Sequence, residues 1–160
     1  MRLALYQPDI PQNTGTILRL TACLGVPTDI IGPAGFDISD RSLRRAGLDY
    51  LSHVDLTRHL SWEEFLQKNA SPTPSRIILL SSKAELTYTD FAFLPDDCLL
   101  LGRESAGAPN HVHKQADACL RIPLRPGLRS LNIAVAAAMV LGEAMRQTKA
   151  FPTGSVAPQL

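Results

Sequence analysis

Three short segments of this chain are apolar without the alternation of a half-exposed strand: Arg2–Tyr6, Arg76–Ser81 and Cys98–Leu101. A continuous apolar strand is typical of a parallel sheet that is covered on both faces. Further strands are predicted at Thr28–Ile31, Tyr50–Leu56 and Leu120–Ile122. Helices are predicted between the strands, at Gln12–Leu24, Ser39–Ala46, Ser61–Asn69 and Asn110–Gln115. This alternation predicts an α/β fold, a single domain with a mostly parallel sheet flanked by helices.

The last predicted strand leads through a polar loop into the most apolar segment of the sequence. From Leu131 to Met145, apolar residues repeat at helical spacing and also occupy the other faces of the helix. We therefore expect a helix that is buried on most sides. The residues before it include Arg129, Ser130 and Asn132, which need partners if they are buried. The prediction is that something polar binds there. Residues 1–150 form the predicted domain and residues 151–160 a tail.

Charge and cysteine content narrow the functional classes. The chain has 160 residues and a net charge of +1, so any contact with nucleic acid must use a local patch rather than the overall field. No apolar run approaches the roughly 18 residues of a membrane span, and the N-terminal run is too short for a signal peptide. Cys23, Cys98 and Cys119 are far apart in apolar surroundings. They favour reduced thiols in a cytoplasmic protein, with no metal site.

Polar or glycine-rich loops follow three of the predicted strands, at residues 12–15, 102–109 and 123–130. In doubly wound sheets, ligands bind beyond the carboxyl ends of the strands, so these loops predict one shared site. Its apolar walls are expected from Leu80, Leu100 and Ile122. Such walls suit a nucleoside-like ligand better than a bare phosphate.

Each of these features also has an explanation that needs no ligand. Asn13 or Thr14 would cap the helix that follows, and Arg19 alone would be a solvated arginine. The segment 102–109 would be an ordinary turn, and it matches neither GxGxxG, nor a P-loop, nor the GxSxG elbow of hydrolases. No nucleophile with a base and no set of metal ligands is legible, which disfavours an enzyme acting on small molecules.

Four motifs in the sequence resemble those of a known protein family: LYQPDIPQNTGTILRL, LRRAGLDY, LLGRESAGAP and RIPLRPGLRSLNIAVA. With these motifs in this order, residues 1–150 resemble the SPOUT superfamily of RNA methyltransferases, and within it the enzymes that methylate the 2′-hydroxyl of tRNA nucleotide 34. The resemblance implies a C-terminal trefoil knot, bound S-adenosylmethionine, and a homodimer with its site completed near the subunit interface. It also implies leucine tRNA as the substrate, with a cytidine or a uridine such as cmnm5-uridine at position 34. By motif match, the cofactor contacts are Leu80, Gly102, Ile122 and Ser130.

The resemblance also implies catalytic roles. Related 2′-O-methyltransferases carry an asparagine and an arginine six residues apart in the first motif, and Asn13 and Arg19 match them. Arginine is a poor base because its pKa lies above about 12. Arg19 is therefore expected to act as a phosphate-assisted proton acceptor or as a clamp on RNA phosphate and ribose. Ser130 and Asn132 complete the catalytic set and would orient the ribose and the loops.

RNA binding requires positive charge in a local patch. One candidate patch, which could equally be a solvated basic helix, consists of Arg41, Arg44 and Arg45. A second consists of Arg121, Arg125 and Arg129. Glu104 matches a further superfamily position, and we expect it and Arg129 to contact RNA.

Two other functions stay open on the same motifs. One is 2′-O-methylation of another RNA site, and the other is a non-catalytic RNA-binding factor on the same fold. Positions 103, 105 and 106 depart from the commonest form of the glycine-rich motif. These departures bear on the tRNA preference and not on the cofactor.

Overall fold

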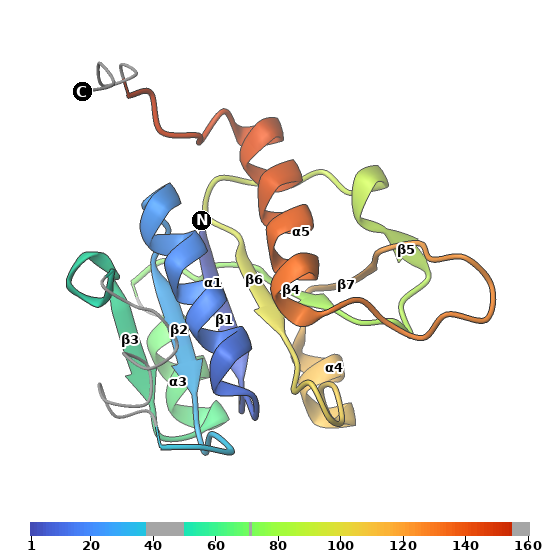
Figure 1. Cartoon of the computed structure of the whole chain (residues 1–160), viewed down its shortest axis with the longest axis horizontal. Helices are drawn as coiled ribbons and strands as arrows, with labels where there is room; N and C mark the ends of the chain where they lie inside the picture. Colours follow the sequence, from blue (N-terminus) through green and yellow to red (C-terminus); the bar gives the residue numbers. More distant parts are fainter. Residues whose placement is uncertain (38–49, 71, 155–160) are drawn as a thin grey trace.

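A parallel sheet forms the centre of the protein (Figure 1), as seen in a computed structural model that describes residues 1–37, 50–70 and 72–154. Within these residues the sheet has seven strands in the order β3-β2-β1-β6-β4-β7-β5, and every pairing is parallel. The strands are β1 (Arg2–Tyr6), β2 (Thr28–Ile31), β3 (Leu56–His59), β4 (Ile77–Leu80), β5 (Leu86–Thr87), β6 (Cys98–Leu101) and β7 (Ala118–Arg121). The predicted α/β fold with a parallel sheet is confirmed.

Helices cover both faces of the sheet (Figure 1). They are α1 (Pro11–Leu24), α3 (Trp62–Asn69), α4 (Asn110–Gln115) and α5 (Ile133–Thr148). Successive strand residues point to opposite faces. Leu3 and Leu5 of β1 therefore pack in the cluster that includes α1 and α5, whereas Ala4 and Tyr6 pack with α3 and α4. Burial on both faces explains why the central strands lack polar alternation. None of the described helices is long and apolar enough to cross a membrane.

Two helix boundaries follow from local sequence. α1 ends at Gly25, whose φ of 66° lies in the left-handed region that glycine adopts at helix ends. The N-cap of α3 is Ser61, whose Oγ accepts a hydrogen bond from Glu64 N at 3.2 Å. The Glu64 carboxylate in turn accepts from Leu60 N at 2.6 Å. The predicted start of α3 at a Ser–Glu pair is confirmed.

Several predicted strand positions are corrected by the structure. The prediction of a strand at Tyr50–Leu56 is wrong, because Leu51–His53 form a 3₁₀ turn and β3 begins at Leu56. β3 pairs only with β2 at the sheet edge, so its pattern includes polar residues that apolar periodicity does not mark. The strand predicted at Leu120–Ile122 begins two residues earlier as β7, and β5 was not predicted. The predicted helix at Ser39–Ala46 lies outside the described residues.

The prediction that the last helix is buried on most sides is wrong. α5 packs on the sheet and against α1, and its buried residues lie on that side. On the opposite side Val135 is 49% exposed and Met139 is 39% exposed, and Leu131 just before the helix is 38% exposed. We call Leu131, Val135 and Met139 the α5 strip. No described segment of this chain covers it.

Candidate functional site

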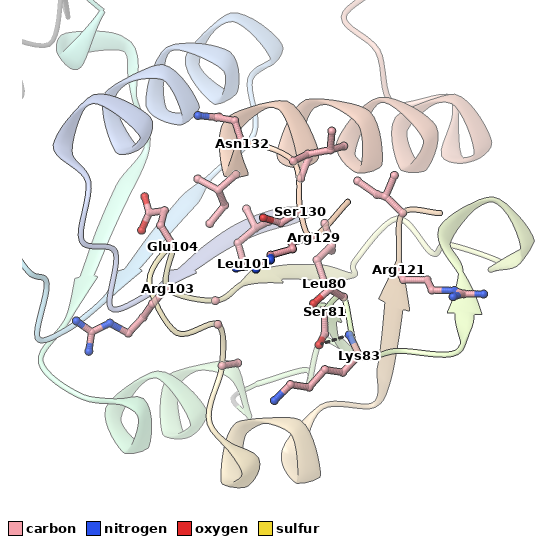
Figure 2. Close-up of a pocket in the computed structure, with 18 of the residues that line it drawn as sticks. Leu80, Ser81, Lys83, Leu101, Arg103, Glu104, Arg121, Arg129, Ser130 and Asn132 are labelled. Carbon is pink, nitrogen blue, oxygen red and sulfur yellow. Dashed lines mark hydrogen bonds between the residues drawn. The ribbon is translucent and has the colours of Figure 1, made fainter. Parts of the chain in front are cut away.

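A cavity of about 620 Å³ lies where β4, β6 and β7 end (Figure 2). Leu80, Leu101 and Ile122 give it apolar walls. The prediction of Leu100 as a wall residue is wrong, because it is buried in the cluster on the other face of the sheet. Because the carboxyl ends of parallel strands share one edge of the sheet, the loops that follow these strands meet there. These loops contribute residues 81–83, 102–104, 106–108 and 129–132 to the lining. Its volume is that of a site for a small organic molecule or cofactor.

The glycine-rich loop after β6 is a tight hairpin. Arg103 N donates to Gly107 O at 3.1 Å, and Gly107 N donates to Arg103 O at 2.8 Å. A Cβ on Gly102 would lie 2.6 Å from both Ala108 N and the carbonyl carbon of Gly107, so the loop closes only with glycine there. Gly107 has a φ of 67°, which other residues rarely adopt. The two glycines thus set the shape of the wall that this loop presents to the cavity.

Hydrogen bonds join four segments of the chain at one end of the cavity. Asn132 Nδ2 donates to Asn13 Oδ1 at 2.9 Å, and Asn13 Nδ2 donates to Glu104 Oε1 at 3.4 Å. The other Glu104 oxygen accepts from Asp9 N at 3.0 Å. These residues belong to the N-cap of α5, the first turn of α1, the loop after β6 and the segment after β1. Asn13 is therefore oriented by a partner on each side of its amide.

The structure brings most of the predicted site residues to this one cavity. The four predicted cofactor contacts all line it: Leu80, Gly102, Ile122 and Ser130. Four further predicted residues line it as well: Asn13, Glu104, Arg129 and Asn132. Figure 2 shows Arg129 and Ser130 beside Leu80 and Leu101, with Glu104 and Asn132 nearer α1. The sequence motifs therefore describe one place, although the roles of the individual residues stay predictions.

Arg19 is not among the residues that line the cavity. It is exposed on α1, and its guanidinium carbon lies 4.8 Å from the centre of the Tyr50 ring. Six residues along an α-helix rotate by about 600°, so Arg19 and Asn13 point roughly 120° apart. The two residues of the first motif consequently do not meet within one chain. Arg41, Arg44 and Arg45 lie outside the described residues.

Positive charge gathers at the cavity without acidic partners. Lys83, Arg121 and Arg129 line the cavity and form no ion pair within the described part of the chain. Several cations elsewhere are paired, as in Arg2–Asp29, Lys68–Glu64 and Arg76–Asp97. The cavity thus has a positively charged side, which attracts anions, and also contains the carboxylate of Glu104.

Two thiols near the sheet stay protonated. Cys119 Sγ lies 3.8 Å from His113 Nδ1, and burial raises the pKa of the Cys119 thiol. Burial also raises the pKa of Cys98 to about 12. Neither residue therefore supplies a thiolate nucleophile at neutral pH. Among the described residues, no group of three or more His, Cys, Asp or Glu could hold a metal ion.

Residues 1–142 match the SpoU rRNA Methylase family. The chain belongs to this family. A tRNA (cytidine(34)-2′-O)-methyltransferase of Beijerinckia indica subsp. indica is 62% identical to it over 157 residues, which are 98% of either chain. A protein of the same name from Ancylobacter novellus is 49% identical over 151 residues, covering 94% of this chain and 95% of the relative.

Solved structures of SpoU-type enzymes have the same fold. One that addresses 2′-OH methylation of C/U34 on tRNA is 44% identical, with a TM-score of 0.85, and covers 91% of this chain and 94% of that chain. The SpoU methyltransferase AviRb of Streptomyces viridochromogenes, solved with its cofactor AdoMet, is 29% identical with a TM-score of 0.82. That match covers 92% of this chain and 60% of AviRb. The resemblance to the SPOUT superfamily is confirmed.

Two residues at the site of this SpoU methylase were missed by the sequence reasoning. Lys83 lines the cavity from the loop after β4, and Asp9 binds the backbone and side chain of Glu104. Both follow directly after a strand, which was the only available indication. Asp9 lies within the first motif, but its partner Glu104 is 95 positions away, and Lys83 N donates locally, to Ser81 Oγ at 3.2 Å. Neither role can therefore be identified from a local pattern.

Proposed function

We propose that this chain transfers the methyl group of S-adenosylmethionine to the ribose 2′-hydroxyl of tRNA nucleotide 34, a cytidine or uridine. The observation that carries the proposal is one cavity that unites the four predicted cofactor residues with the hydrogen bonds around Asn13. Two relatives, at 62% and 49% identity, are named for this activity on cytidine 34. The proposed substrates are the leucine tRNAs.

The residues of the cavity fit S-adenosylmethionine. Leu80, Leu101 and Ile122 offer apolar surface to an adenine ring, and the backbone at Gly102 allows close approach. The Ser130 hydroxyl adds a polar contact, and a cavity of about 620 Å³ accepts a nucleoside joined to an amino acid. When bound, the cofactor supplies an electrophilic methyl group, and the protein supplies alignment.

The residues at the Asn13 end of the cavity would orient the ribose. Each oxygen of a carboxylate has about two acceptor sites. Glu104 can therefore accept a hydrogen bond from a ribose hydroxyl while it keeps its bonds from Asn13 and Asp9. Asn132 holds the opposing loop in place through its bond to Asn13, and Ser130 would help to orient the ribose. Because a 2′-hydroxyl is a weak nucleophile, alignment with the methyl group and an acceptor for its proton are what the site must provide.

Arg19 would act in the cavity of a second subunit. It lies away from the cavity of its own chain, and the SPOUT resemblance implies homodimers whose sites are completed at the interface. The α5 strip offers the apolar surface for such an interface, since Val135 is 49% and Met139 39% exposed. In this homodimer Arg19 would clamp an RNA phosphate beside the ribose. Because a guanidinium with a pKa above about 12 is already protonated, the 2′-hydroxyl proton would leave through that phosphate to solvent as the bond from the ribose oxygen to the methyl group forms.

The RNA would approach over the unpaired cations of the cavity. Lys83, Arg121 and Arg129 present the local positive charge that a chain of net charge +1 needs to bind RNA. Arg41, Arg44 and Arg45 are proposed as a second contact. The three cysteines are all free, which supports a reducing compartment, the cytoplasm.

Transfer of tritiated methyl groups to bulk tRNA, followed by nucleoside mapping, tests the proposal. The expected label is 2′-O-methylated cytidine or uridine at position 34 of leucine tRNAs. Label at another tRNA nucleotide, or in ribosomal RNA offered in a parallel assay, would replace the substrate and keep the reaction. Binding of both S-adenosylmethionine and RNA without transfer would instead indicate a non-catalytic RNA-binding factor.

A further inference from the structure

Asp9, in the segment between β1 and α1, exchanges two hydrogen bonds with Glu104 in the loop after β6. Asp9 N donates to Glu104 Oε2 at 3.0 Å, and Glu104 N donates to Asp9 Oδ1 at 3.2 Å. The Ser105 hydroxyl also donates to Asp9 Oδ2. The pair is separated by 95 positions in the sequence, so these bonds fix two segments that meet only in the folded chain.

Asp9 is itself held from another side. Arg103 Nε lies 3.5 Å from Asp9 Oδ2, and Figure 2 shows the Arg103 side chain pointing away from Ser130. In the loop after β2, Gly35 N donates to Pro8 O at 2.8 Å. A Cβ on Gly35 would lie only 2.9 Å from Asp9 Cβ. The carboxylate of Asp9 is therefore packed between two loops, with little freedom to move.

The charge of Asp9 suits this role. Partial burial alone would raise the pKa of Asp9, but the hydrogen bonds from Ser105 and Glu104 and the charge of Arg103 lower it below its ordinary value. The carboxylate is consequently ionised at neutral pH, and an ionised carboxylate only accepts hydrogen bonds. Two groups donate hydrogen bonds to it, Glu104 N–H and the Ser105 hydroxyl, and the Arg103 guanidinium forms an ion pair with it; the Glu104 carboxyl also lies against it.

From this geometry we infer that Asp9 is a positioning residue for methyl transfer, which holds the Glu104 carboxylate at the ribose end of the cavity. The inference rests on the proposed function, because Glu104 can orient a ribose only if RNA enters this cavity. Asp9 is not one of the described residues that line the cavity, whereas Glu104 is. Asp9 therefore acts through Glu104 and does not touch the substrate.

A double-mutant cycle separates this role from general support of the fold. The variants are Asp9→Ala, Glu104→Ala and their combination, with Asp96→Ala as the control because Asp96 is exposed in the turn before β6. Single-turnover methyl transfer to tRNA gives the rate, and calorimetry gives the Kd for S-adenosylmethionine. Gly35→Ala provides a second way to displace Asp9 without removing its charge, and Asp9→Asn keeps an oxygen that can accept from Glu104 N.

The expected result is coupling between the two residues. Asp9→Ala and Gly35→Ala should slow transfer by about 10- to 100-fold, the cost of misplacing a group by about 1 Å. In the Glu104→Ala background the same substitutions should change the rate of methyl transfer by less than about twofold. The Kd for S-adenosylmethionine should stay within about twofold, the limit for an uncoupled site, and Asp9→Asn should recover most of the rate.

Two results would overturn the inference. One is an equal loss of rate in both backgrounds, which would show that Asp9 does not act through Glu104. The other is a loss of cofactor affinity that matches the loss of rate, which would make Asp9 a general support of the loop. A wild-type protein that labels no RNA would instead remove the proposed function itself, so the two failures are distinguishable.

Discussion

Asn132 donates a hydrogen bond from Nδ2 to Asn13 Oδ1 at 2.9 Å, although 119 positions separate the two residues. The same Asn132 caps α5, since its Oδ1 accepts from Ala134 N at 2.8 Å and from Val135 N at 3.4 Å. One side chain thus both begins the last helix and connects it to the first turn of α1. The side chain that caps α5 therefore also connects two of the segments that form the site.

Replacement of Asn132 can separate these two roles. Asn132→Asp keeps an oxygen for the cap and favours the helix dipole, but it loses the donor to Asn13. Its free energy of unfolding should stay within about 0.5 kcal/mol of wild type, whereas Asn132→Ala should lose about 1 kcal/mol through the missing cap. Methyl transfer should fall in both variants. Urea unfolding and a transfer assay measure the two effects, and an Asn132→Asp variant with full activity would contradict the role of the Asn132–Asn13 bond.

Gly102→Ala tests the fit of the loop after β6. A Cβ at this position would meet backbone atoms of Gly107 and Ala108 at 2.6 Å, so the hairpin must shift. Because this hairpin lines the cavity, affinity for S-adenosylmethionine measured by calorimetry should fall by at least about tenfold, or roughly 1.4 kcal/mol. The matched control is Gly142→Ala in α5, where a Cβ has nothing within 4 Å. That variant should bind normally and gain about 0.5–1 kcal/mol of stability.

The strands that sequence predicted well are those buried on both faces. β2 and β6 have the predicted bounds, Thr28–Ile31 and Cys98–Leu101. β3 was misplaced and β5 missed, because one lies at the sheet edge and the other has only two residues. Exposed or minimal strands are determined by their pairing partners, which periodicity does not reveal.

In the site, too, residues that local sequence marks could be predicted, and residues whose role depends on a distant partner could not. Gly102, Ile122 and Ser130 could be named because each follows a strand end and matches a motif, and the structure places them on one cavity. Asp9 could not be named, since its importance depends on a partner 95 positions away. The exposure of the α5 strip could not be predicted either. The apolar residues of a helix have the same pattern whether their own chain or a second chain covers them.

Salt dependence of RNA binding tests the unpaired cations of the cavity. Lys83→Ala, Arg121→Ala and Arg129→Ala should each weaken binding to tRNA. If each side chain neutralises one phosphate, the slope of log Kd against log salt concentration should decrease by about 0.7–0.9. Lys68→Ala is the control, because Lys68 is paired with Glu64 at 2.8 Å on α3. An unchanged slope in all three cavity variants would place the RNA elsewhere.

The α5 strip predicts the behaviour of a charged variant. Val135 is 49% exposed on an apolar helix face, and a carboxylate there would be desolvated in any interface between two copies. Wild type should therefore sediment as the proposed dimer and Val135→Glu as a monomer, and Val135→Glu should lose methyl transfer. Gln67→Glu, on the exposed side of α3, adds the same charge and should stay dimeric. A dimeric Val135→Glu variant would show that another surface joins the subunits.

Mixed dimers decide whether Arg19 serves its own cavity or that of its partner. Arg19→Ala and Glu104→Ala should each leave only a small residual rate of transfer when pure, because each removes one component from both sites. If Arg19 works across the interface, a mixed dimer of the two variants has one intact site, in the subunit that keeps Glu104. Random reassembly of equal amounts makes about half of the dimers mixed, so about a quarter of wild-type activity should return in a symmetric dimer. If Arg19 works within its own chain, both sites of the mixed dimer are defective and no activity returns.

The measurement is made by co-refolding the two variants, with sedimentation to confirm that dimers form. An Arg19→Ala variant that is active alone would remove Arg19 from the mechanism altogether.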